Sequence, residues 1–194
     1  MNSRADHTLV DRDGVARNAR VPTIHQPCAS LIAQGIKRLE NRTWTPPPED
    51  LALGDYVLLH AGKTFDLDAW QGAIDVAVHQ GVSVAWLAEM RNPLATVRSI
   101  ANRTLRATAV RAAEVRAKEL VPFSAIVGVA RFIRGLEHGD IATAGRWYVG
   151  PFGWALDEAT VIEPVPVNGA QGLFRVEPPV FSLMRARWHE VALG

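Results

Sequence analysis

The segment Gly35-Ile-Lys-Arg-Leu-Glu-Asn-Arg-Thr-Trp44 decides the fold, because it places four charged side chains in a stretch that otherwise has the pattern of a β-strand. Strand alternation puts Lys37 on one face and Glu40 with Arg42 on the other. A site that uses both Lys37 and Glu40 therefore requires a bulge, a strand entrance or a twisted barrel wall. The alternative is a cluster of surface ion pairs, each worth about 0 to 1 kcal/mol.

The segments on either side predict the order strand, helix, strand, strand. Residues 21–25 form an apolar strand, and a helix then begins near Pro27 and ends at Gly35. After the charged segment, consecutive prolines predict a stiff loop. The apolar run 56–60 is typical of a buried strand, and the glycine that follows it predicts a turn at 60–63.

Residues 66–120 differ in composition from the rest of the chain. They are rich in Ala, Val, Leu and Arg and poor in proline and glycine, which predicts two or three helices inserted into the fold. Residues 95–120 contain six basic and two acidic residues, a local excess of four positive charges. A solvated helix face is the favoured interpretation. Contact with backbone phosphates is the alternative.

The C-terminal part returns to strand patterns and closes with an amphipathic segment. These stretches lie at 124–133, 154–162, 172–177 and 180–191. Glycines between and within them fit the bends of a small, strongly curved sheet. The sum predicts an α+β fold, a small mixed β-barrel with helices at its rim, rather than an alternating βαβ sheet.

Three ranges describe the predicted domain organisation. Residues 1–20 mix charges of both signs without a sustained period, which is typical of a flexible N-terminal arm. Residues 21–194 are predicted to form a single domain that carries the helical insertion at 66–120. The length of 194 residues and the hydrophobic content of 48% suit one globular domain with a sizeable core.

Composition also narrows the function classes. The formal net charge is only +1, so any nucleic-acid surface must be a local patch. The single cysteine, Cys28, excludes an intrachain disulfide and a multi-cysteine zinc site and favours the cytoplasm. No apolar run reaches the roughly 20 residues of a membrane span. The first residues lack the pattern of a signal peptide.

Polar side chains gather at the ends of successive predicted elements. They are His25, Gln26, Lys37, Glu40, Arg42, His60 and Lys63. Several donors with one carboxylate suit a phosphate or the edge of a nucleobase. Trp44 and Trp154 lie near turns or strand ends and pack in a core or, alternatively, offer stacking platforms worth about 1 to 3 kcal/mol per base.

Metal and cofactor chemistry is not predicted. His25 and His60 follow apolar strand residues and lack a clear set of carboxylate partners, so we expect no metal. No glycine-rich phosphate loop is present in the sequence, and we expect no cofactor. Cys28 lies near the start of the first helix, where a nucleophilic thiolate is conceivable. Its apolar neighbours favour a small buried residue instead.

Five motifs together carry a family resemblance. They are His25-Gln-Pro-x-Ala-Ser-Leu-Ile32, Gly35-x-Lys-x-x-Glu-x-Arg-x-Trp44, Leu58-Leu-His-Ala-Gly-Lys63, Val127-Gly-Val-Ala130 and Gly150-Pro-x-Gly-Trp-x-Leu156. The chain resembles an ASCH domain, a member of the PUA-like β-barrel superfamily. The resemblance covers residues 21–177 and is interrupted by 66–120. Its most specific part is the motif from Gly35 to Arg42.

The resemblance implies a barrel of five or six strands with a cleft beside the first helix. It implies binding of RNA or of a modified nucleobase or nucleoside in that cleft. By the same analogy Lys37, Glu40 and Arg42 line the cleft, and the neighbouring positions are His25, Gln26, His60 and Lys63. Many relatives carry Trp where this chain has Cys28, so one aromatic wall is expected to be missing.

One ASCH branch hydrolyses the amide of 4-N-acetylcytidine, with a catalytic lysine, a threonine three residues later and a more distant glutamate. Lys37 matches the lysine, but Glu40 stands at the threonine position. The alternative function is therefore a small hydrolase, an acylated-cytidine amidohydrolase or a ribonuclease, in which Lys37 and Glu40 transfer protons. A third possibility is an interaction domain whose insertion at 66–120 contacts a protein partner.

Overall fold

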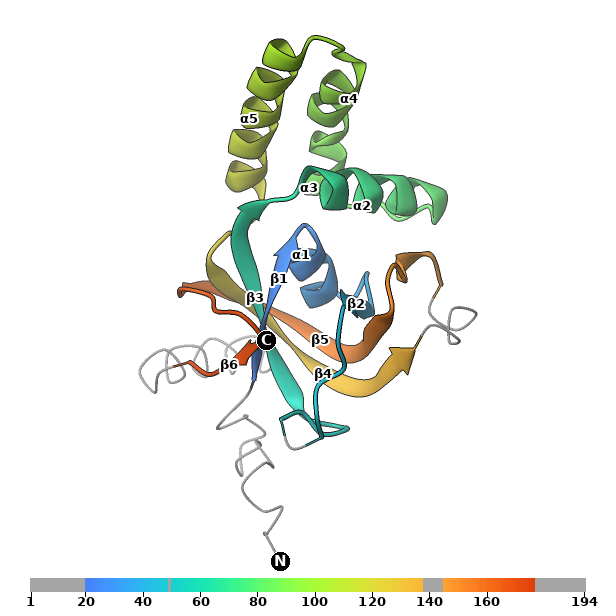
Figure 1. Cartoon of the computed structure of the whole chain (residues 1–194), viewed down its shortest axis with the longest axis vertical. Helices are drawn as coiled ribbons and strands as arrows, with labels where there is room; N and C mark the ends of the chain where they lie inside the picture. Colours follow the sequence, from blue (N-terminus) through green and yellow to red (C-terminus); the bar gives the residue numbers. More distant parts are fainter. Residues whose placement is uncertain (1–19, 49, 138–144, 177–194) are drawn as a thin grey trace, which may run out of the picture.

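The computed structural model describes residues 20–48, 50–137 and 145–176. A curved sheet forms one half of the molecule, and a group of helices stands over one of its ends (Figure 1). The first helix lies against the sheet between these two parts (Figure 1). The chain is therefore a mixed α+β protein, as its sequence predicts.

Six strands form one mixed sheet. They are β1 (Val21–Gln26), β2 (Leu39–Arg42), β3 (Tyr56–Phe65), β4 (Ala125–Glu137), β5 (Phe152–Pro166) and β6 (Leu173–Phe174). Their spatial order is β2-β5-β4-β3-β1-β6. Strand β1 pairs with β3 in parallel, and the other neighbours are antiparallel. This order is not that of an alternating βαβ sheet.

Backbone pairing among the described residues does not close the sheet into a barrel. Strands β2 and β6 stand at its two edges. The sheet nevertheless curls far enough for β2 to reach β1. Arg42 Nη2 on β2 donates a hydrogen bond of 3.0 Å to the carbonyl of Thr23 on β1. A side chain spans the gap that a barrel would close with a ladder of backbone hydrogen bonds.

Strand β3 differs from its prediction, because the predicted turn at 60–63 is wrong. The strand continues from Tyr56 to Phe65. Gly62 stays extended within it and lies against β1, where an added Cβ would come within 3.2 Å of Thr23 Cγ2. The glycine therefore allows close approach of two strands rather than a change of direction.

Five α-helices and a 3₁₀ turn accompany the sheet in the described part of the chain. They are α1 (Cys28–Ala33), α2 (Leu67–His79), α3 (Ala85–Glu89), α4 (Arg91–Ser99), α5 (Arg103–Leu120) and η3 (Gly145–Trp147). Four of them follow β3, so the prediction of two or three helices at 66–120 is wrong. Helix α3 escaped prediction because it has only five residues and no side-chain cap, and Met90 alone separates it from α4.

Helix α1 joins two separate cores. Its Ile32 packs with Leu59, Phe132 and Trp154 in the core on the concave face of the sheet. The adjacent Leu31 packs instead into the core shared by helices α2 to α5. A third core covers the other face of the sheet. One short helix thus couples the helical part of the molecule to the sheet.

Two sequence predictions fall on other parts of the chain. The predicted N-terminal arm, apart from residue 20, and the predicted helix at 180–191 lie outside the described residues. Within the described ranges, no helix combines the length and apolar character that crossing a membrane requires.

Gly128 on β4 is the position where α1 approaches the sheet most closely. A Cβ added there would lie 2.7 Å from Ala33 Cβ and 2.8 Å from the Thr160 carbonyl oxygen. We expect Gly128→Ala to lower the free energy of unfolding by about 1 to 3 kcal/mol, because the helix must shift. Urea denaturation measures this change.

Gly72 in the middle of α2 provides the matched control. Nothing lies within 4 Å of an added Cβ at this position. Gly72→Ala should leave stability unchanged or raise it by up to about 1 kcal/mol, because alanine favours the helix. Equal stability of the two alanine variants would contradict the close packing of α1 on β4.

Candidate functional site

Three charged side chains, here called the charged cluster, meet beside α1. They are Lys37, Glu40 and Arg42. Only 2% of Lys37 and 7% of Glu40 are exposed. Lys37 Nζ lies 3.6 Å from Glu40 Oε2, and Arg42 Nε lies 3.3 Å from Glu40 Oε1. One buried carboxylate is therefore held between two cations, which is not the arrangement of a surface ion-pair cluster.

The start of β2 explains how Lys37 and Glu40 meet. The strand begins at Leu39, so Lys37 lies before it. The direction of the Lys37 side chain therefore does not have to follow the alternation of faces along the strand. Lys37 Nζ also donates a hydrogen bond to the carbonyl of Leu39. Of the three geometries that the sequence allowed, the strand entrance is the one observed.

The charged cluster carries unmatched positive charge. Its two cations and one carboxylate sum to a formal charge of +1 in a place that is largely shielded from water. Arg42 Nε is buried, and its alignment gives it no hydrogen bond to any described residue. Removing an ion from water costs several kcal/mol unless partners compensate. The cluster therefore favours an anionic or electron-rich group.

Two tryptophans flank the charged cluster. Trp154 on β5 lies opposite Glu40 in the strand register and is fully buried. The guanidinium carbon of Arg42 lies 5.0 Å from the centroid of the Trp154 ring, within the range of a cation–π contact. Trp44 is half-buried and packs edge to face against Trp154, with centroids 5.2 Å apart. Trp154 thus supports Arg42, and Trp44 is the more accessible aromatic side chain.

A cavity of about 210 Å³ lies between α1 and the middle of β5. Its lining includes Ile32, Gly35 and Lys37 together with residues 156–159. The cavity stands next to the first helix, where the predicted cleft would lie. It borders Lys37 but is not lined by Glu40 or Arg42.

Cys28 lies close enough to the charged cluster for the cluster to affect its pKa. Burial raises the pKa of the Cys28 thiol, Lys37 opposes this effect, and the negative charges of Glu40 and Asp66 add to it. The net shift is upward, so the thiol stays protonated at neutral pH. The position at the start of a helix does not activate it as a nucleophile.

His25 pairs with a residue that the sequence did not single out. Its Nδ1 lies 3.0 Å from Asp66 Oδ2, and its side chain is half exposed. Asp66 also caps α2 by accepting a hydrogen bond from the Ala69 amide. Burial acts to raise the pKa of Asp66, but these hydrogen bonds outweigh it and hold the pKa below its usual value. An aspartate directly before a helix is a recognisable capping signal.

Gln26 and Lys63 do not join the charged cluster. Gln26 is fully buried and bonds both to Ser30 and, at 2.7 Å, to the carbonyl of Pro122. Its amide therefore fastens α1 to the segment that follows α5. Lys63 is exposed near the end of β3 and forms no ion pair with a described residue.

His60 lies on the opposite face of the sheet from the charged cluster. Its Nε2 is 3.0 Å from the carbonyl of Val167, and its ring packs edge to face against Phe174. Both neighbours belong to the third core rather than to the concave core that holds Trp154. The sequence analysis placed His60 and Lys63 together as neighbours of the cleft because it predicted a turn at 60–63, where β3 in fact continues.

The described ranges hold no group of three His, Cys, Asp or Glu side chains arranged to bind a metal ion. The site consists of ion pairs, amide and carbonyl groups and aromatic rings. Its chemistry is therefore that of hydrogen bonding, stacking and charge compensation.

Comparison with known families decides the relationship. The model of the ASCH domain family matches residues 23–122. The chain belongs to the ASCH family. This family is part of the PUA-like superfamily. No curated protein matches the sequence.

The match locates the charged cluster within the ASCH domain. Residues 23–122 include the whole segment Gly35 to Trp44 and also helices α2 to α5. The predicted resemblance extended to residue 177 and treated 66–120 as an interruption. The family match instead runs through that helical stretch and ends before β4.

The buried His60 makes the stability of this ASCH domain depend on pH. Burial lowers the pKa of His60, so the folded protein resists the proton that the unfolded chain binds below about pH 6.5. His60 therefore lowers stability progressively as the pH falls below that value. The contribution reaches at most about 1.4 kcal/mol per pH unit.

We expect His60→Gln to flatten the pH dependence of the free energy of unfolding between about pH 7.5 and 5. Glutamine keeps a donor for the Val167 carbonyl but does not titrate. Urea denaturation at a series of pH values compares the two proteins. If the free energies of unfolding of the two proteins change with pH in parallel, His60 binds no more protons in the unfolded chain than in the folded protein.

Proposed function

We propose that this ASCH domain binds RNA or a modified nucleobase or nucleoside at the charged cluster beside α1. The observation that carries the proposal is the buried excess of positive charge, in which Arg42 Nε pairs with Glu40 Oε1 at 3.3 Å without completing a hydrogen bond. ASCH domains are often linked to RNA binding, which supports the same class of ligand. We propose further that the cytoplasm is its location, as its single cysteine suggests.

The chemistry of the cluster suits the edge of a nucleobase better than a simple anion. A base edge offers both acceptors and N–H donors. Arg42 and Lys37 supply donors, and Glu40 supplies an acceptor between them. Trp44 offers a half-buried ring for stacking. A phosphate alone would be repelled by the negative charge of the Glu40 carboxylate.

The curled sheet suits a PUA-like barrel. Arg42 bridges β2 to β1 across the open side, and we propose that this side closes around the ligand. The neighbouring cavity of about 210 Å³ is smaller than the roughly 300 to 1,000 Å³ of sites for drug-sized ligands. A cavity of this size, which Lys37 alone of the charged cluster lines, favours a single base-sized group beside the cluster.

Lys37→Met tests the proposal, because methionine keeps the length and apolar stem of lysine but removes the charge. We expect binding of a short single-stranded RNA or of modified nucleosides to fall by at least about 10-fold, the loss of one charged hydrogen bond. Fluorescence anisotropy measures RNA binding, and calorimetry measures nucleoside binding. Circular dichroism confirms that the variant is folded.

Arg38→Ala is the matched control from the same segment. The Arg38 side chain is 71% exposed, pairs loosely with Asp157 and lines the neighbouring cavity, but it forms no ion pair with Glu40. Its loss should change binding less than Lys37→Met does. Wild-type protein that binds neither RNA nor any nucleoside would refute the proposed function.

A hydrolase is the second candidate, and one distance favours it. Lys37 Nζ and Glu40 Oε2 lie 3.6 Å apart in a nearly buried site, so a proton can pass between lysine, carboxylate and a bound water. Glu40 would act as general base for water attacking an acyl group or, in RNA, for the ribose hydroxyl. The thiol of Cys28 takes no part, since its pKa is raised.

Glu40→Gln separates catalysis from binding. If the protein is a hydrolase, this change should lower kcat for an acylcytidine or an RNA by about 100-fold or more, because the general base is removed. Steady-state assays against both substrates give the answer. An unchanged rate in a folded variant would remove the catalytic role of Glu40.

A protein partner bound through helices α2 to α5 is the third candidate. These helices share a core with Leu31 of α1, and Gln26 binds the segment after α5. Deleting 66–120 would therefore uncover part of α1. Surface substitutions on the helices provide the cleaner separation of this role from binding at the charged cluster.

A further inference from the structure

The hairpin of α4 and α5 carries a concentration of basic charge that the low net charge of the whole chain does not reveal. Residues 90–113 contain five arginines and no acidic residue. Residues 91–120 hold seven basic and two acidic residues, a net charge of +5, whereas the whole chain carries +1. The remainder of the protein is therefore net negative. The two helices pack side by side and project away from the sheet (Figure 1).

The cations of the hairpin fall into two groups. Three of them form ion pairs with carboxylates, namely Arg98 with Asp75, Arg116 with Glu89 and Glu119, and Lys118 with Glu114. The other four form no ion pair or hydrogen bond with a described residue. These unpaired arginines, here called the arginine face, are Arg91, Arg103, Arg106 and Arg111.

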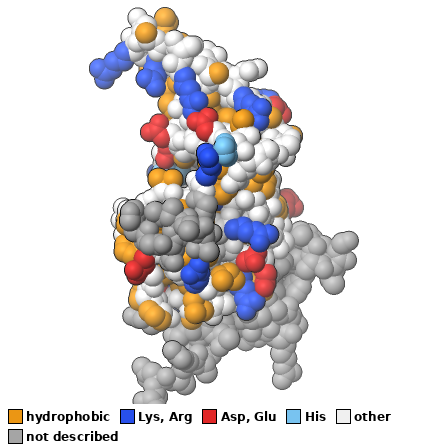
Figure 2. All heavy atoms as spheres, turned by 90° about the vertical axis from the view of Figure 1, so that its right-hand side faces the viewer, with side chains coloured by type: hydrophobic (Ala, Val, Ile, Leu, Met, Phe, Trp, Pro, Cys, Tyr) orange, Lys and Arg blue, Asp and Glu red, His pale blue; other side chains and the backbone are white. Residues whose placement is uncertain are grey.

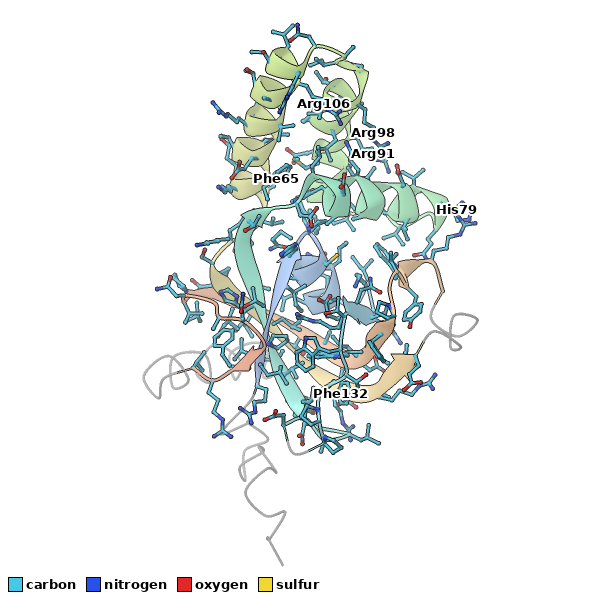
Figure 3. The ribbon with its side chains drawn as sticks, in the orientation of Figure 1. Phe65, His79, Arg91, Arg98, Arg106 and Phe132 are labelled. Atoms are coloured by element: carbon cyan, nitrogen blue, oxygen red, sulfur yellow. The ribbon has the colours of Figure 1, made fainter. Side chains whose placement is uncertain are left out.

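Arg103, Arg106 and Arg111 lie in the half of α5 that adjoins the connection to α4 at the free end of the hairpin, whereas Arg91 lies at the start of α4, at the base of the hairpin (Figure 3). Arg103 and Arg106 are one turn apart near the start of α5, and Arg111 follows within about 12 Å along the helix axis. All four side chains are exposed. Figure 3 shows Arg106 on the hairpin above Arg98 and Arg91, and Figure 2 shows basic side chains recurring over the helical half of another face. Two of the paired cations, Arg116 and Lys118, lie nearer the sheet in the second half of α5, and the third, Arg98, lies in the last turn of α4.

Unpaired arginines at this density indicate a polyanionic partner. Like charges one turn apart repel each other and slightly destabilise the helix. Their cost is offset when phosphates bind, because arginine donates two parallel hydrogen bonds to phosphate oxygens. Phosphates of a nucleic-acid strand are about 3.4 Å apart along a duplex axis, so about 12 Å of helix spans several of them.

The exposed large apolar side chains among the described residues of the hairpin lie far apart. Leu105 and Val115 are 61% and 60% exposed. They lie ten residues apart, about 15 Å along α5. Charge, rather than apolar area, distinguishes this hairpin.

We infer that the arginine face is a second contact surface, which binds the sugar–phosphate backbone of the RNA whose base enters the charged cluster. This inference rests on the proposed function for the identity of the RNA. The charged cluster selects a base, and the arginine face supplies sequence-independent affinity. The helices of this chain therefore extend the binding surface beyond the ASCH cleft.

The test compares two triple variants that remove the same charge from the full-length chain. Arg103→Gln, Arg106→Gln and Arg111→Gln together neutralise most of the arginine face. The control neutralises paired cations, through Arg98→Gln, Arg116→Gln and Lys118→Gln. Binding of a fluorescein-labelled 20-nucleotide RNA of mixed sequence is measured between 50 and 300 mM KCl.

We expect the arginine-face variant to bind RNA about 10-fold or more weakly at 0.1 M salt. The slope of log K against log salt should fall by about 2, roughly 0.7 for each lost contact with a single strand. The control should change the slope by less than half as much. Nucleoside binding should stay unchanged in both variants, because a nucleoside has no phosphate.

The alternative outcomes are distinguishable. Equal losses in both variants would show an effect of net charge alone and overturn the inference. Unchanged RNA binding in the arginine-face variant, with RNA binding lost in Lys37→Met, would overturn the inference and keep the proposed function. Polyglutamate that displaces the RNA at equal charge concentration would assign the arginine face to an acidic protein instead.

Two further results would each support one of the two proposals and refute the other. Salt-dependent RNA binding that survives Lys37→Met, without nucleoside binding, would sustain the arginine face and refute the charged cluster as a base site. Nucleoside binding without RNA binding would support the charged cluster as a base site and refute the arginine face as a contact surface for RNA.

Discussion

The carboxylate of Glu40 is the constraint on which the site and one side of the sheet depend. It lies between Lys37 and Arg42, and it makes their burial tolerable. Arg42 in turn reaches the Thr23 carbonyl and covers the ring of Trp154, so it connects β2, β1 and β5. The groups proposed to bind a ligand are therefore the groups that hold the curled sheet together. A ligand at the cluster would act directly on the open side of the sheet.

Three kinds of contact at helix α1 fix the position of helices α2 to α5 relative to the sheet. Leu31 and Ile32 enter different cores, Gly128 leaves room for the helix, and Gln26 binds the Pro122 carbonyl. The arginine hairpin is consequently attached through a packed joint rather than through a flexible linker. The two proposed binding surfaces, on such a body, would act on one RNA with an effective concentration set by the joint.

Sequence patterns predicted the features that depend on neighbours in the chain. The apolar runs gave the central strands, and the charged segment pointed to Lys37, Glu40 and Arg42. His60 was misplaced because glycine marks both turns and close strand contacts, and only the packing of Thr23 against Gly62 distinguishes them. Asp66 was overlooked because its partner, His25, is 41 residues away. The bridge from Arg42 to β1 was likewise invisible, since it depends on the curl of the whole sheet.

The low net charge of the chain gives a misleading view of its electrostatics. A value of +1 is the sum of +5 on the hairpin and −4 on the rest of the chain. The negative remainder repels a polyanion, so binding must concentrate where cations lack carboxylate partners. Positive charge exceeds negative charge at the arginine face, which is exposed to solvent, and at the charged cluster, which is shielded from it. Salt screens the first strongly and the second only weakly, which agrees with the proposed division, in which the hairpin supplies general affinity and the charged cluster selects a base.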